Sequence, residues 1–335
     1  MKDKDSKSQR PDLLFHNDRA NDWCAGCGDF GILRSLEKTL ATMNLQPDQV
    51  AVFGGIGCSG KTPYYLSTYG IHTLHGRVLP FATGAKLARP TLTVIAVGGD
   101  GDGLSIGAGH LVNAGRRNVD ITYIIFDNGV YGLTKGQASP TLKYGEQTKA
   151  MPFPSMMEHI NPITLALTAG FTWIGRGYAY NVNHLCELIE QAIRHPGSAL
   201  LTVFQPCPTY NQLHDKDWYA GKELSGDMGR LYSLQDEGYD PLVPYAAGQT
   251  SREQKMLQCF NAAQQWEARI PIGIFFQDLS RPQLLDNLSQ RHTGYTLASP
   301  AEQSVCDKHG QSLANLDKLF DVLSVRVPRS NGTGD

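Results

Sequence analysis

The chain has 335 residues, which allows a large buried core and as many as two domains. Its 30 basic and 32 acidic side chains nearly cancel, so the composition lacks the basic field that favours nucleic-acid binding. No apolar run approaches the roughly 20 residues that span a bilayer, and the charged start MKDKDSKSQRPD does not resemble a signal peptide. We therefore expect a cytoplasmic protein that binds neither nucleic acid nor a membrane.

Short apolar runs alternate with segments of helical periodicity along most of the chain. In chain order, the predicted elements are helix Ile32–Met43, strand Val50–Gly55, strand Thr91–Val97, helix Leu104–Ala114, strand Ile121–Phe126, helix Pro162–Ala169, strand Phe171–Ile174, helix Val182–Arg194, strand Ala199–Phe204, helix Arg252–Arg269 and strand Ile272–Gln277. This alternation predicts an α/β fold with a doubly wound, mostly parallel sheet and helices on both faces.

The alternation weakens after Pro208, where residues 209–250 are rich in Tyr, Gly, Asp and polar groups. We therefore expect residues 13–210 to form the main domain and residues 211–327 to form a C-terminal extension of it rather than an independent fold. The polar ends, 1–12 and 328–335, show no periodicity and are expected to be disordered.

Four of the seven cysteines can act together. Cys24 and Cys27 form a C-x-x-C pair, while Cys58 and Cys207 each follow an apolar run. The carboxyl ends of parallel strands meet at one edge of a sheet, so the four thiolates can share a metal site. Unrelated thiols remain the alternative, because no second C-x-x-C closes the set. The other three, Cys186, Cys259 and Cys306, stand alone and are interpreted as ordinary thiols.

A Gly-Asp-Gly turn follows one predicted strand, and an Asp-Asn pair follows the next. Asp100 lies in the turn, and Asn128 comes 28 residues later. Mg²⁺ prefers oxygen ligands and commonly keeps a phosphate among them. A carboxylate, an amide oxygen and a backbone carbonyl from these strand ends can therefore hold a magnesium diphosphate, and the glycines let the backbone approach closely. A glycine-rich turn followed by an Asn turn, without a ligand, is the alternative.

The segment Gly55–Thr62 matches the phosphate-binding P-loop pattern G-x-x-x-x-G-K-T after a strand. However, Pro63 and the pair Tyr64-Tyr65 follow where a P-loop runs into an amphipathic helix. The P-loop interpretation also leaves the Gly-Asp-Gly turn and the cysteines unexplained. A further segment, His75-Gly76-Arg77, lies in a loop near the same strand edge. A lone histidine is usually structural, but this position makes it a candidate for proton transfer.

At these residues the chain resembles the β subunits of the 2-oxoacid:ferredoxin oxidoreductases, most closely the two-subunit 2-oxoglutarate type. The matching segments are WCAGCGDFGIL, GGIGCSGK, HTLHGRVLPFATGAKLARP, GGDGDGLSIG, DNGVYGLTKGQASPT, QPCPTYN and PIGIFF. The resemblance covers about residues 12–285, and the residues after 285 match poorly.

The resemblance implies a thiamine-diphosphate-binding fold that holds Mg²⁺ and one 4Fe-4S cluster. The cluster ligands would be Cys24, Cys27, Cys58 and Cys207, and the magnesium ligands would be Asp100, Asn128 and the carbonyl of Val130. The other cofactor contacts are expected from Gly57, Ser59, His75, Gly99, Gly101, Asp102, Tyr131 and Thr134. His75 and Arg77 would lie near the thiazolium and the substrate, and Lys61 would offer a positive charge to a substrate carboxylate or to the phosphates.

The implied reaction is the CoA-dependent oxidative decarboxylation of a 2-oxo acid, with electrons passed through the cluster to ferredoxin. We expect 2-oxoglutarate as the substrate, giving succinyl-CoA and CO₂, and pyruvate or another 2-oxo acid is the alternative. The resemblance also implies an α subunit, in an αβ or (αβ)₂ assembly, that supplies the glutamate for activating the cofactor. The chain alone is therefore expected to be inactive. Two other classes stay open, a P-loop nucleotide hydrolase and a non-catalytic, metal-stabilised scaffold subunit.

Overall fold

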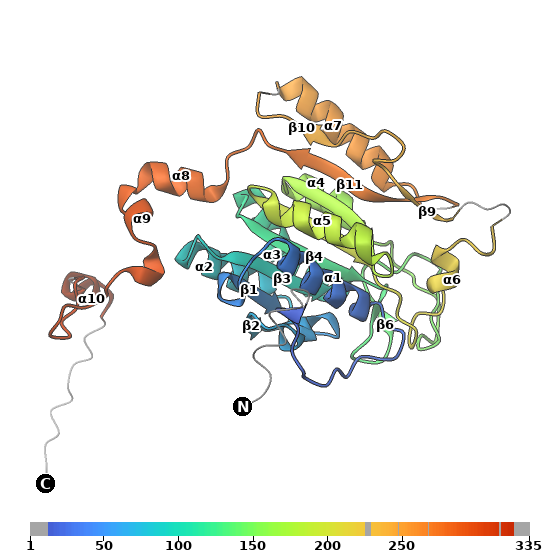
Figure 1. Cartoon of the computed structure of the whole chain (residues 1–335), viewed down its shortest axis with the longest axis horizontal. Coiled ribbons are helices and arrows are strands. Elements are labelled where there is room, and N and C mark those ends of the chain that lie inside the picture. The colour runs from blue at the N-terminus through green and yellow to red at the C-terminus, as the bar shows by residue number, and fades with distance from the viewer. Residues whose placement is uncertain (1–12, 225–228, 247, 267, 315, 325–335) are drawn as a thin grey trace, which may run out of the picture.

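The computed structural model describes residues 13–224, 229–246, 248–266, 268–314 and 316–324. A nine-stranded sheet runs through the molecule and is covered by helices on both faces (Figure 1). The strand order is β10-β11-β7-β8-β4-β3-β1-β2, and β9 pairs with β11. The expected doubly wound, mostly parallel sheet is confirmed. The expected disorder of residues 1–12 and 328–335 concerns residues outside the described part of the chain.

The sheet strands are β1 (Val50–Gly54), β2 (Tyr69–His72), β3 (Thr93–Gly99), β4 (Ile121–Asp127), β7 (Trp173–Tyr178), β8 (Ser198–Phe204), β9 (Leu231–Ser233), β10 (Leu242–Val243) and β11 (Ile270–Asp278). A separate hairpin joins β5 (Val130–Tyr131) and β6 (Gln137–Ala138). The helices are α1 (Asp29–Thr42), α2 (Val78–Ala88), α3 (Ala108–Arg117), α4 (Pro162–Ala169), α5 (Val182–Arg194), α6 (Lys216–Tyr219), α7 (Gln249–Ala263), α8 (Leu284–Arg291), α9 (Thr293–Leu297) and α10 (Asp317–Leu323).

The central strands are buried on both faces, which explains their continuous apolar runs. Val50 and Val52 pack in the cluster that contains the apolar stripes of α1 and α5. Ala51 and Phe53, which alternate with them, pack in the cluster formed with α2, α3 and α4. Strands β2, β1, β3, β4, β8 and β7 pair in parallel, so their carboxyl ends lie along one edge. Chain segments far apart in sequence therefore meet at that edge.

Two helices were predicted with their observed bounds, α4 and α5. Each begins after an asparagine whose side chain accepts backbone N–H groups of the first turn, Asn161 for α4 and Asn181 for α5. Other predictions need correction. Strand β7 begins at Trp173 and continues to Tyr178. Helix α7 ends at Ala263, six residues before its predicted end. A π-helical turn, Asp102–Ile106, precedes α3.

The part of the chain after residue 210 extends the same sheet. Strand β11 runs antiparallel to β7 and carries β9 and β10 beside it. Helices α8, α9 and α10 then lead away from the sheet (Figure 1). At the other end of the sheet, β2 is the edge strand, and Tyr69 and Ile71 on it are 52% and 45% exposed. Within the described residues, no helix is both long and apolar enough to cross a membrane.

Candidate functional site

A cavity of about 210 Å³ lies at the carboxyl ends of β1, β3, β4 and β8. It brings together most of the predicted site residues, although they come from four separate loops. The predicted residues that line it are Gly57, Cys58, Ser59, His75, Gly99, Asp100, Gly101, Asp102, Asn128, Val130, Tyr131 and Thr134. In an open α/β sheet, this edge is where ligands bind.

Asp100 forms the centre of one end of this cavity, which we call the metal-binding end after the magnesium ligands predicted there from the sequence (Asp100, Asn128 and Val130). Its side chain is buried and accepts hydrogen bonds from the backbone N–H groups of Gly101 and Gly129, both at 2.9 Å. The hydroxyls of Ser139 and Thr141 also donate to its Oδ2, both at 2.5 Å. These donors hold the carboxylate in one orientation. Oδ1 accepts one of the four hydrogen bonds, from Gly101, and keeps a lone pair for a further ligand.

The carboxyl of the half-buried Asp127 lies next to Asp100. The Thr141 hydroxyl lies 2.7 Å from Asp127 Oδ1 as well as 2.5 Å from Asp100 Oδ2. A hydroxyl can donate only one hydrogen bond, so it cannot satisfy both acceptors. Burial raises the pKa of Asp100, and burial together with the Asp100 charge raises the pKa of Asp127 to about 7. This surplus of oxygen acceptors suits a divalent cation, because hard cations such as Mg²⁺ prefer oxygen ligands.

Asn128 and Val130 complete the metal-binding end. Asn128 Oδ1 accepts the backbone N–H of Val130 at 2.9 Å, and Asn128 Nδ2 donates to Gln205 Oε1 at 2.7 Å. Gln205 is buried and lines the cavity, yet no sequence pattern singled it out. It directly follows the predicted strand Ala199–Phe204 and lies two residues before Cys207, and its contacts place it between the two ends of the cavity.

Asp102 fixes the two loops that face the metal-binding end. Its Oδ1 accepts the backbone N–H groups of Ile56 at 2.9 Å and Gly76 at 2.8 Å, and lies 2.8 Å from His75 Nδ1. Because a buried carboxylate is an acceptor, His75 Nδ1 carries the proton in this contact. In the neutral imidazole, Nε2 then keeps its lone pair, and the side chain of His75 is 38% exposed beside the cavity.

Gly101, in the Gly-Asp-Gly turn, must be a glycine because the ring of Tyr131 packs against it. An ideal Cβ at Gly101 would lie 2.2 Å from the ring of Tyr131, so only glycine lets that ring close over the turn. The Tyr131 hydroxyl lies 3.4 Å from the Gly101 carbonyl, to which it donates.

Cys58 lines the other end of the cavity, and we call the region around it the cysteine end, after the four predicted ligands Cys24, Cys27, Cys58 and Cys207. Cys24, Cys27 and Cys207 are not among the lining residues, and Cys24 is exposed. An ideal Cβ at Gly132 would lie 3.6 Å from Cys58 Sγ and 3.9 Å from Cys207 Sγ, so both sulfurs lie beside this glycine. Cys27 Sγ accepts a hydrogen bond from Gln205 Nε2 at 3.1 Å.

Hydrogen bonds tie the loops of the cysteine end together. Trp23 Nε1 donates to the carbonyl of Cys58 at 2.8 Å, and the Gly28 N–H donates to the carbonyl of Pro206 at 3.2 Å. The structure thus brings together the loops of Cys27, Cys58 and Cys207, although Cys27 and Cys207 are 180 positions apart in the chain.

The thiols at this end influence one another. Burial raises the pKa of Cys27, Cys58 and Cys207, that of Cys58 to about 11, and the charges of neighbouring cysteines raise the pKa of Cys27 and Cys58 further. Among the described residues, no three His, Cys, Asp or Glu side chains are arranged around a single ion. A 4Fe-4S cluster binds each of its four thiolates to a different iron, so it does not require the sulfurs to converge on one point.

Two family models match the chain. The model for the thiamine pyrophosphate enzyme C-terminal TPP-binding domain matches residues 55–203, and the model for the C-terminal part of the pyruvate ferredoxin oxidoreductase β chain matches residues 207–292. A 2-oxoacid:ferredoxin oxidoreductase subunit β from Sulfolobus sp is 47% identical over 91% of this chain and 97% of the relative.

The chain belongs to the β subunits of the 2-oxoacid:ferredoxin oxidoreductases. Among the similar proteins is also the 2-oxoglutarate oxidoreductase subunit KorB of Mycobacterium tuberculosis, 46% identical over 59% of this chain and 53% of the relative. A solved structure of 2-oxoglutarate:ferredoxin oxidoreductase from Magnetococcus marinus, with 2-oxoglutarate, coenzyme A and succinyl-CoA bound, superposes with a TM-score of 0.76 at 30% identity. It covers 94% of this chain and 96% of that chain. The similarity extends past residue 285, where we expected it to fade, because the Sulfolobus alignment spans 307 residues.

The P-loop interpretation of this β subunit is wrong. A 3₁₀ helix, Ser59–Tyr65, follows the loop in place of the α-helix that a P-loop needs, and Pro63 lies inside it. Lys61 does not line the cavity, and its Nζ lies 2.7 Å from Asp22 Oδ2. Arg77 precedes α2 and also lies outside the cavity lining. The scaffold interpretation is wrong as well, because the family is one of oxidoreductases.

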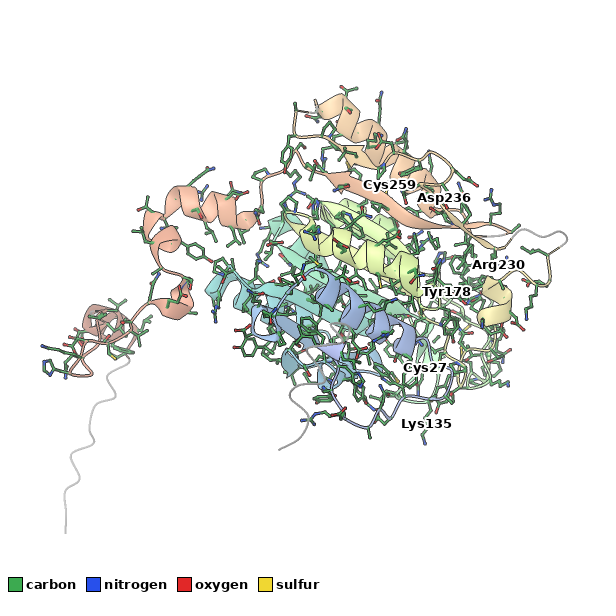
Figure 2. The ribbon with its side chains drawn as sticks, viewed as in Figure 1. Cys27, Lys135, Tyr178, Arg230, Asp236 and Cys259 are labelled. Atoms are coloured by element: carbon green, nitrogen blue, oxygen red, sulfur yellow. The ribbon has the colours of Figure 1, made fainter. Side chains whose placement is uncertain are left out.

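The three remaining cysteines of the β subunit are separate from the cysteine end. Cys259 is buried on α7, and Figure 2 shows it well apart from Cys27. Cys186 donates to the carbonyl of Ser35 at 3.6 Å, and Cys306 is exposed. None of them lines the cavity among the described residues.

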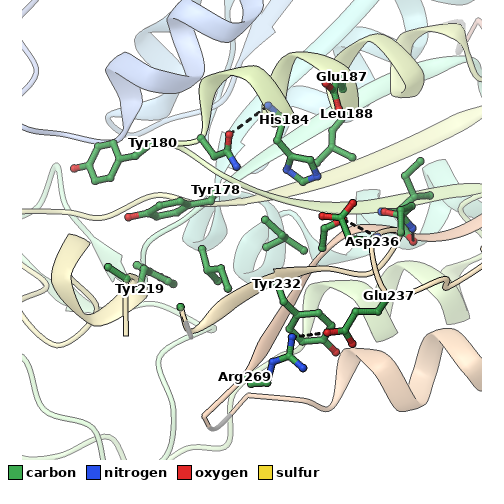
Figure 3. A pocket seen from close by; sticks show the side chains of 18 of the residues that line it. Tyr178, Tyr180, His184, Glu187, Leu188, Tyr219, Tyr232, Asp236, Glu237 and Arg269 are labelled. Atoms are coloured by element: carbon green, nitrogen blue, oxygen red, sulfur yellow. Dashed lines mark hydrogen bonds and ion pairs between the residues drawn. The ribbon is translucent and has the colours of Figure 1, made fainter. Parts of the chain in front are cut away.

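A larger cavity, of about 1020 Å³, lies between α5 and strands β9 and β11 (Figure 3). Tyr178, Tyr180 and Tyr232 line it together with Asp236 and the ion pair between Arg269 and Glu237. In the described part of the chain it contains none of the predicted site residues. It nevertheless borders the cysteine end, because the Tyr180 hydroxyl donates to the carbonyl of Gly26 at 2.5 Å.

Proposed function

We propose that this β subunit holds thiamine diphosphate through Mg²⁺ at the metal-binding end and a 4Fe-4S cluster at the cysteine end. Asp100, Asn128 Oδ1 and the Val130 carbonyl would bind the ion, and Cys24, Cys27, Cys58 and Cys207 would bind the cluster. The observation that supports this most directly is that Cys58 lines the same cavity as Asp100, Asn128 and Val130. A hard oxygen set and a thiolate set thus face one space.

The other lining residues fit a diphosphate and a reacting group. Gly57, Gly99 and Gly101 let the backbone approach an anion, and Ser59, Tyr131 and Thr134 add hydroxyls. His75 presents Nε2 beside the cavity, while Asp102 holds its Nδ1. An imidazole in that tautomer can accept a proton from a substrate or return one at neutral pH. Arg77, one residue beyond Gly76, is proposed to act with His75 near the substrate.

When bound, thiamine diphosphate supplies the carbanion chemistry of 2-oxo acid decarboxylation, and the cluster accepts electrons one at a time. We propose 2-oxoglutarate and CoA as the substrates, succinyl-CoA and CO₂ as the products, and ferredoxin as the acceptor. The relatives that act on 2-oxoglutarate and the similar structure with 2-oxoglutarate and coenzyme A bound support this choice. Pyruvate or another 2-oxo acid is the alternative.

We also propose an α subunit as the partner, in an αβ or (αβ)₂ complex in the cytoplasm. The name β subunit in the relatives implies such a partner. In the described chain the cavity is lined by two aspartates and one histidine but by no glutamate that could activate the cofactor. The α subunit is therefore proposed to supply that glutamate.

The test is reconstitution with the α subunit under anaerobic conditions, followed by measurement of kcat/KM for a panel of 2-oxo acids with CoA and ferredoxin. We expect 2-oxoglutarate to exceed pyruvate, because a site built for a distal carboxylate leaves its cation unpaired when pyruvate binds. A tenfold preference for pyruvate, about 1.4 kcal/mol, would overturn the choice of substrate. A purified complex that contains neither iron nor thiamine diphosphate would overturn the cofactor assignment.

A further inference from the structure

We propose that Gln205 is a positioning residue that couples the cysteine end of the cavity to the metal-binding end. The inference rests on the proposed function. It goes beyond it by assigning one buried side chain to both cofactors: Gln205 would tune the reduction potential of the cluster and orient a magnesium ligand.

The contacts of Gln205 reach both ends. Its Nε2 donates to Cys27 Sγ at 3.1 Å and to the carbonyl of Pro206 at 3.0 Å. Its Oε1 accepts a hydrogen bond from Asn128 Nδ2 at 2.7 Å. Gln205 is only 2% exposed, so no solvent competes for these bonds. One amide therefore bridges a proposed cluster ligand and a proposed magnesium ligand.

Backbone groups at both ends of this chain of amides fix which atom is nitrogen and which is oxygen. The carbonyl of Pro206 can only accept, so the atom of Gln205 beside it must be the NH₂ group. Gln205 then presents its oxygen to Asn128, whose NH₂ group must face it. At the far end, the N–H of Val130 can only donate, and it requires the oxygen of Asn128. Gln205 and the N–H of Val130 thus favour the same orientation of the Asn128 amide.

The backbone holds Gln205 in place from two sides. Its own N–H donates to the carbonyl of Asp127 at 2.8 Å, next to Asn128. On the other side an ideal Cβ at Gly28 would lie 3.0 Å from Gln205 Cγ, so the glycine after Cys27 makes room for this side chain. The side chain is therefore packed between the two loops that it joins.

Two consequences follow. A hydrogen bond to a cluster sulfur stabilises the more negative, reduced form and raises the reduction potential. An amide that orients a metal ligand raises the affinity for the metal, as outer-shell partners generally do. Both effects come from the same side chain. The reduction potential of the cluster and the affinity for Mg²⁺ and thiamine diphosphate would therefore change together.

The decisive variant is Gln205→Met in the complete αβ complex, because methionine keeps the approximate volume and removes every hydrogen bond. We expect a tenfold shift of the one-electron equilibrium toward the oxidised cluster, about 59 mV lower in midpoint potential. We also expect a roughly tenfold weaker Mg²⁺-dependent affinity for thiamine diphosphate. The potential is read by an EPR-monitored redox titration, and the affinity by calorimetry.

A second variant separates the two bonds. Gln205→Glu keeps an oxygen toward Asn128 and replaces the donor toward Cys27, so the potential should fall while the affinity for thiamine diphosphate stays within threefold of the parent. The matched control is Gln235→Met, whose amide bonds the backbone of Ile274 away from both ends, and it should change neither quantity.

The outcomes distinguish this inference from the proposed function. A parent complex with no cluster or no thiamine diphosphate would overturn the proposed function itself. A parent complex with both cofactors, together with a Gln205→Met complex whose potential and affinity match those of the parent, would overturn only the role of Gln205. In the Gln205→Met complex, a potential shift without any change in affinity would likewise contradict the coupling. If Gln205→Met does not fold, Gln205→Leu, which also removes every side-chain hydrogen bond, is measured in the same two ways.

Discussion

The two ends of the central sheet each carry a network of buried polar side chains, but the networks differ in what they face. At the carboxyl end, Asp100 and Asn128 border a cavity of about 210 Å³. At the amino end, Asn118, Thr172 and His195 are 1%, 0% and 2% exposed and bond mainly to one another and to the adjacent backbone.

The amino-end network is paired within the protein except at His195 Nδ1. Asn118 Oδ1 accepts hydrogen bonds from Thr172 Oγ1 at 2.8 Å and from the backbone N–H of Ser198 at 2.9 Å. Asn118 Nδ2 donates to the carbonyl of Pro282 at 3.1 Å, which fastens the segment before α8. The carboxyl end instead has more acceptors than donors around Asp100 and Asp127. A satisfied network stabilises the fold, whereas a network with surplus acceptors can take up a cation.

The largest expected effect is on the cysteine end. Cys58→Ser should abolish ferredoxin reduction and remove most of the visible absorbance near roughly 400 nm, because one ligand of the cluster is lost. Cys259→Ser, a buried thiol on α7, is the matched control and should keep its iron. Full iron content in the Cys58 variant would remove this cysteine from the site.

The next effect is on the metal-binding end. Asp100→Asn should weaken the retention of thiamine diphosphate by at least about 100-fold, more than the loss of an outer-shell partner costs, while the cluster stays in place. Calorimetry and iron analysis on the same sample measure both. Asp278→Asn changes another buried strand-end aspartate, which pairs with Arg252 at 2.7 Å. It should lower stability and leave the affinity for the cofactor unchanged. Equal affinity in the Asp100 variant would break the assignment.

Substitutions at the amino end of the sheet should lower stability and leave cofactor affinity unchanged. Asn118→Ala should cost about 3 kcal/mol of unfolding free energy, because it leaves buried donors of Thr172 and Ser198 without an acceptor. Cofactor affinity at low temperature should not change. Asn118 also has a positive φ of 51°, as does the exposed Asn44 with 56°. Asn44→Ala therefore measures the backbone contribution alone, and denaturant titration of both variants isolates the buried network.

The amino end also predicts a dependence of stability on pH. Burial lowers the pKa of His195 to about 4, and its Nδ1 has no partner among the described residues. A histidine whose folded pKa is depressed contributes stability that is present above its unfolded pKa, about 6.5, and is lost as the pH falls toward 4.

The unfolding free energy should therefore drop by about 2 kcal/mol between pH 7 and pH 5 from this group alone. Replacing the histidine by a residue that does not titrate tests this. His195→Gln keeps a donor for Thr172, so the difference between pH 7 and pH 5 should shrink by that amount. A parent and variant with parallel stability curves would contradict the role of His195.

The smallest effect is expected at Lys61, which belongs to neither of the two networks. Its ammonium group pairs with Asp22, and such partly exposed pairs contribute less than about 1 kcal/mol. Lys61→Met should change KM for the 2-oxo acid by less than about threefold, and Asp22→Asn should have the same small effect. A tenfold rise of KM in the lysine variant alone would show that Lys61 contacts the substrate carboxylate.

The parts of the fold that could be predicted are those set by local signals. Helices α4 and α5 follow Asn161 and Asn181, whose caps are visible in the sequence. Helix α2 was missed because Pro80 and Gly84 lie within it and normally interrupt helices. Strand β7 was placed too early because it continues through Gly175 and the buried Arg176, whose guanidinium lies between aromatic rings that only the tertiary structure provides.

The same distinction holds for the site. Asp100, Asn128 and Cys58 follow strands, and the parallel sheet necessarily brings strand ends together, so the sequence was sufficient to group them. Gln205 also follows a predicted strand, Ala199–Phe204, but an amide is not marked as a ligand by its residue type, and its partners Asn128 and Cys27 are 77 and 178 positions away. Arg77 and Lys61 lie near the right loops in sequence, but the direction of a side chain depends on its neighbours in space.

Strand β2 has a consequence for how cells must produce this protein. It is the last strand of the sheet, with Tyr69 and Ile71 exposed, and in the described part of the chain no other strand covers its outer edge. An uncovered edge with apolar side chains is a template for aggregation. We expect the chain to aggregate when it is synthesised in excess over its partner. The organism that makes the two subunits would therefore need to produce them in matched amounts.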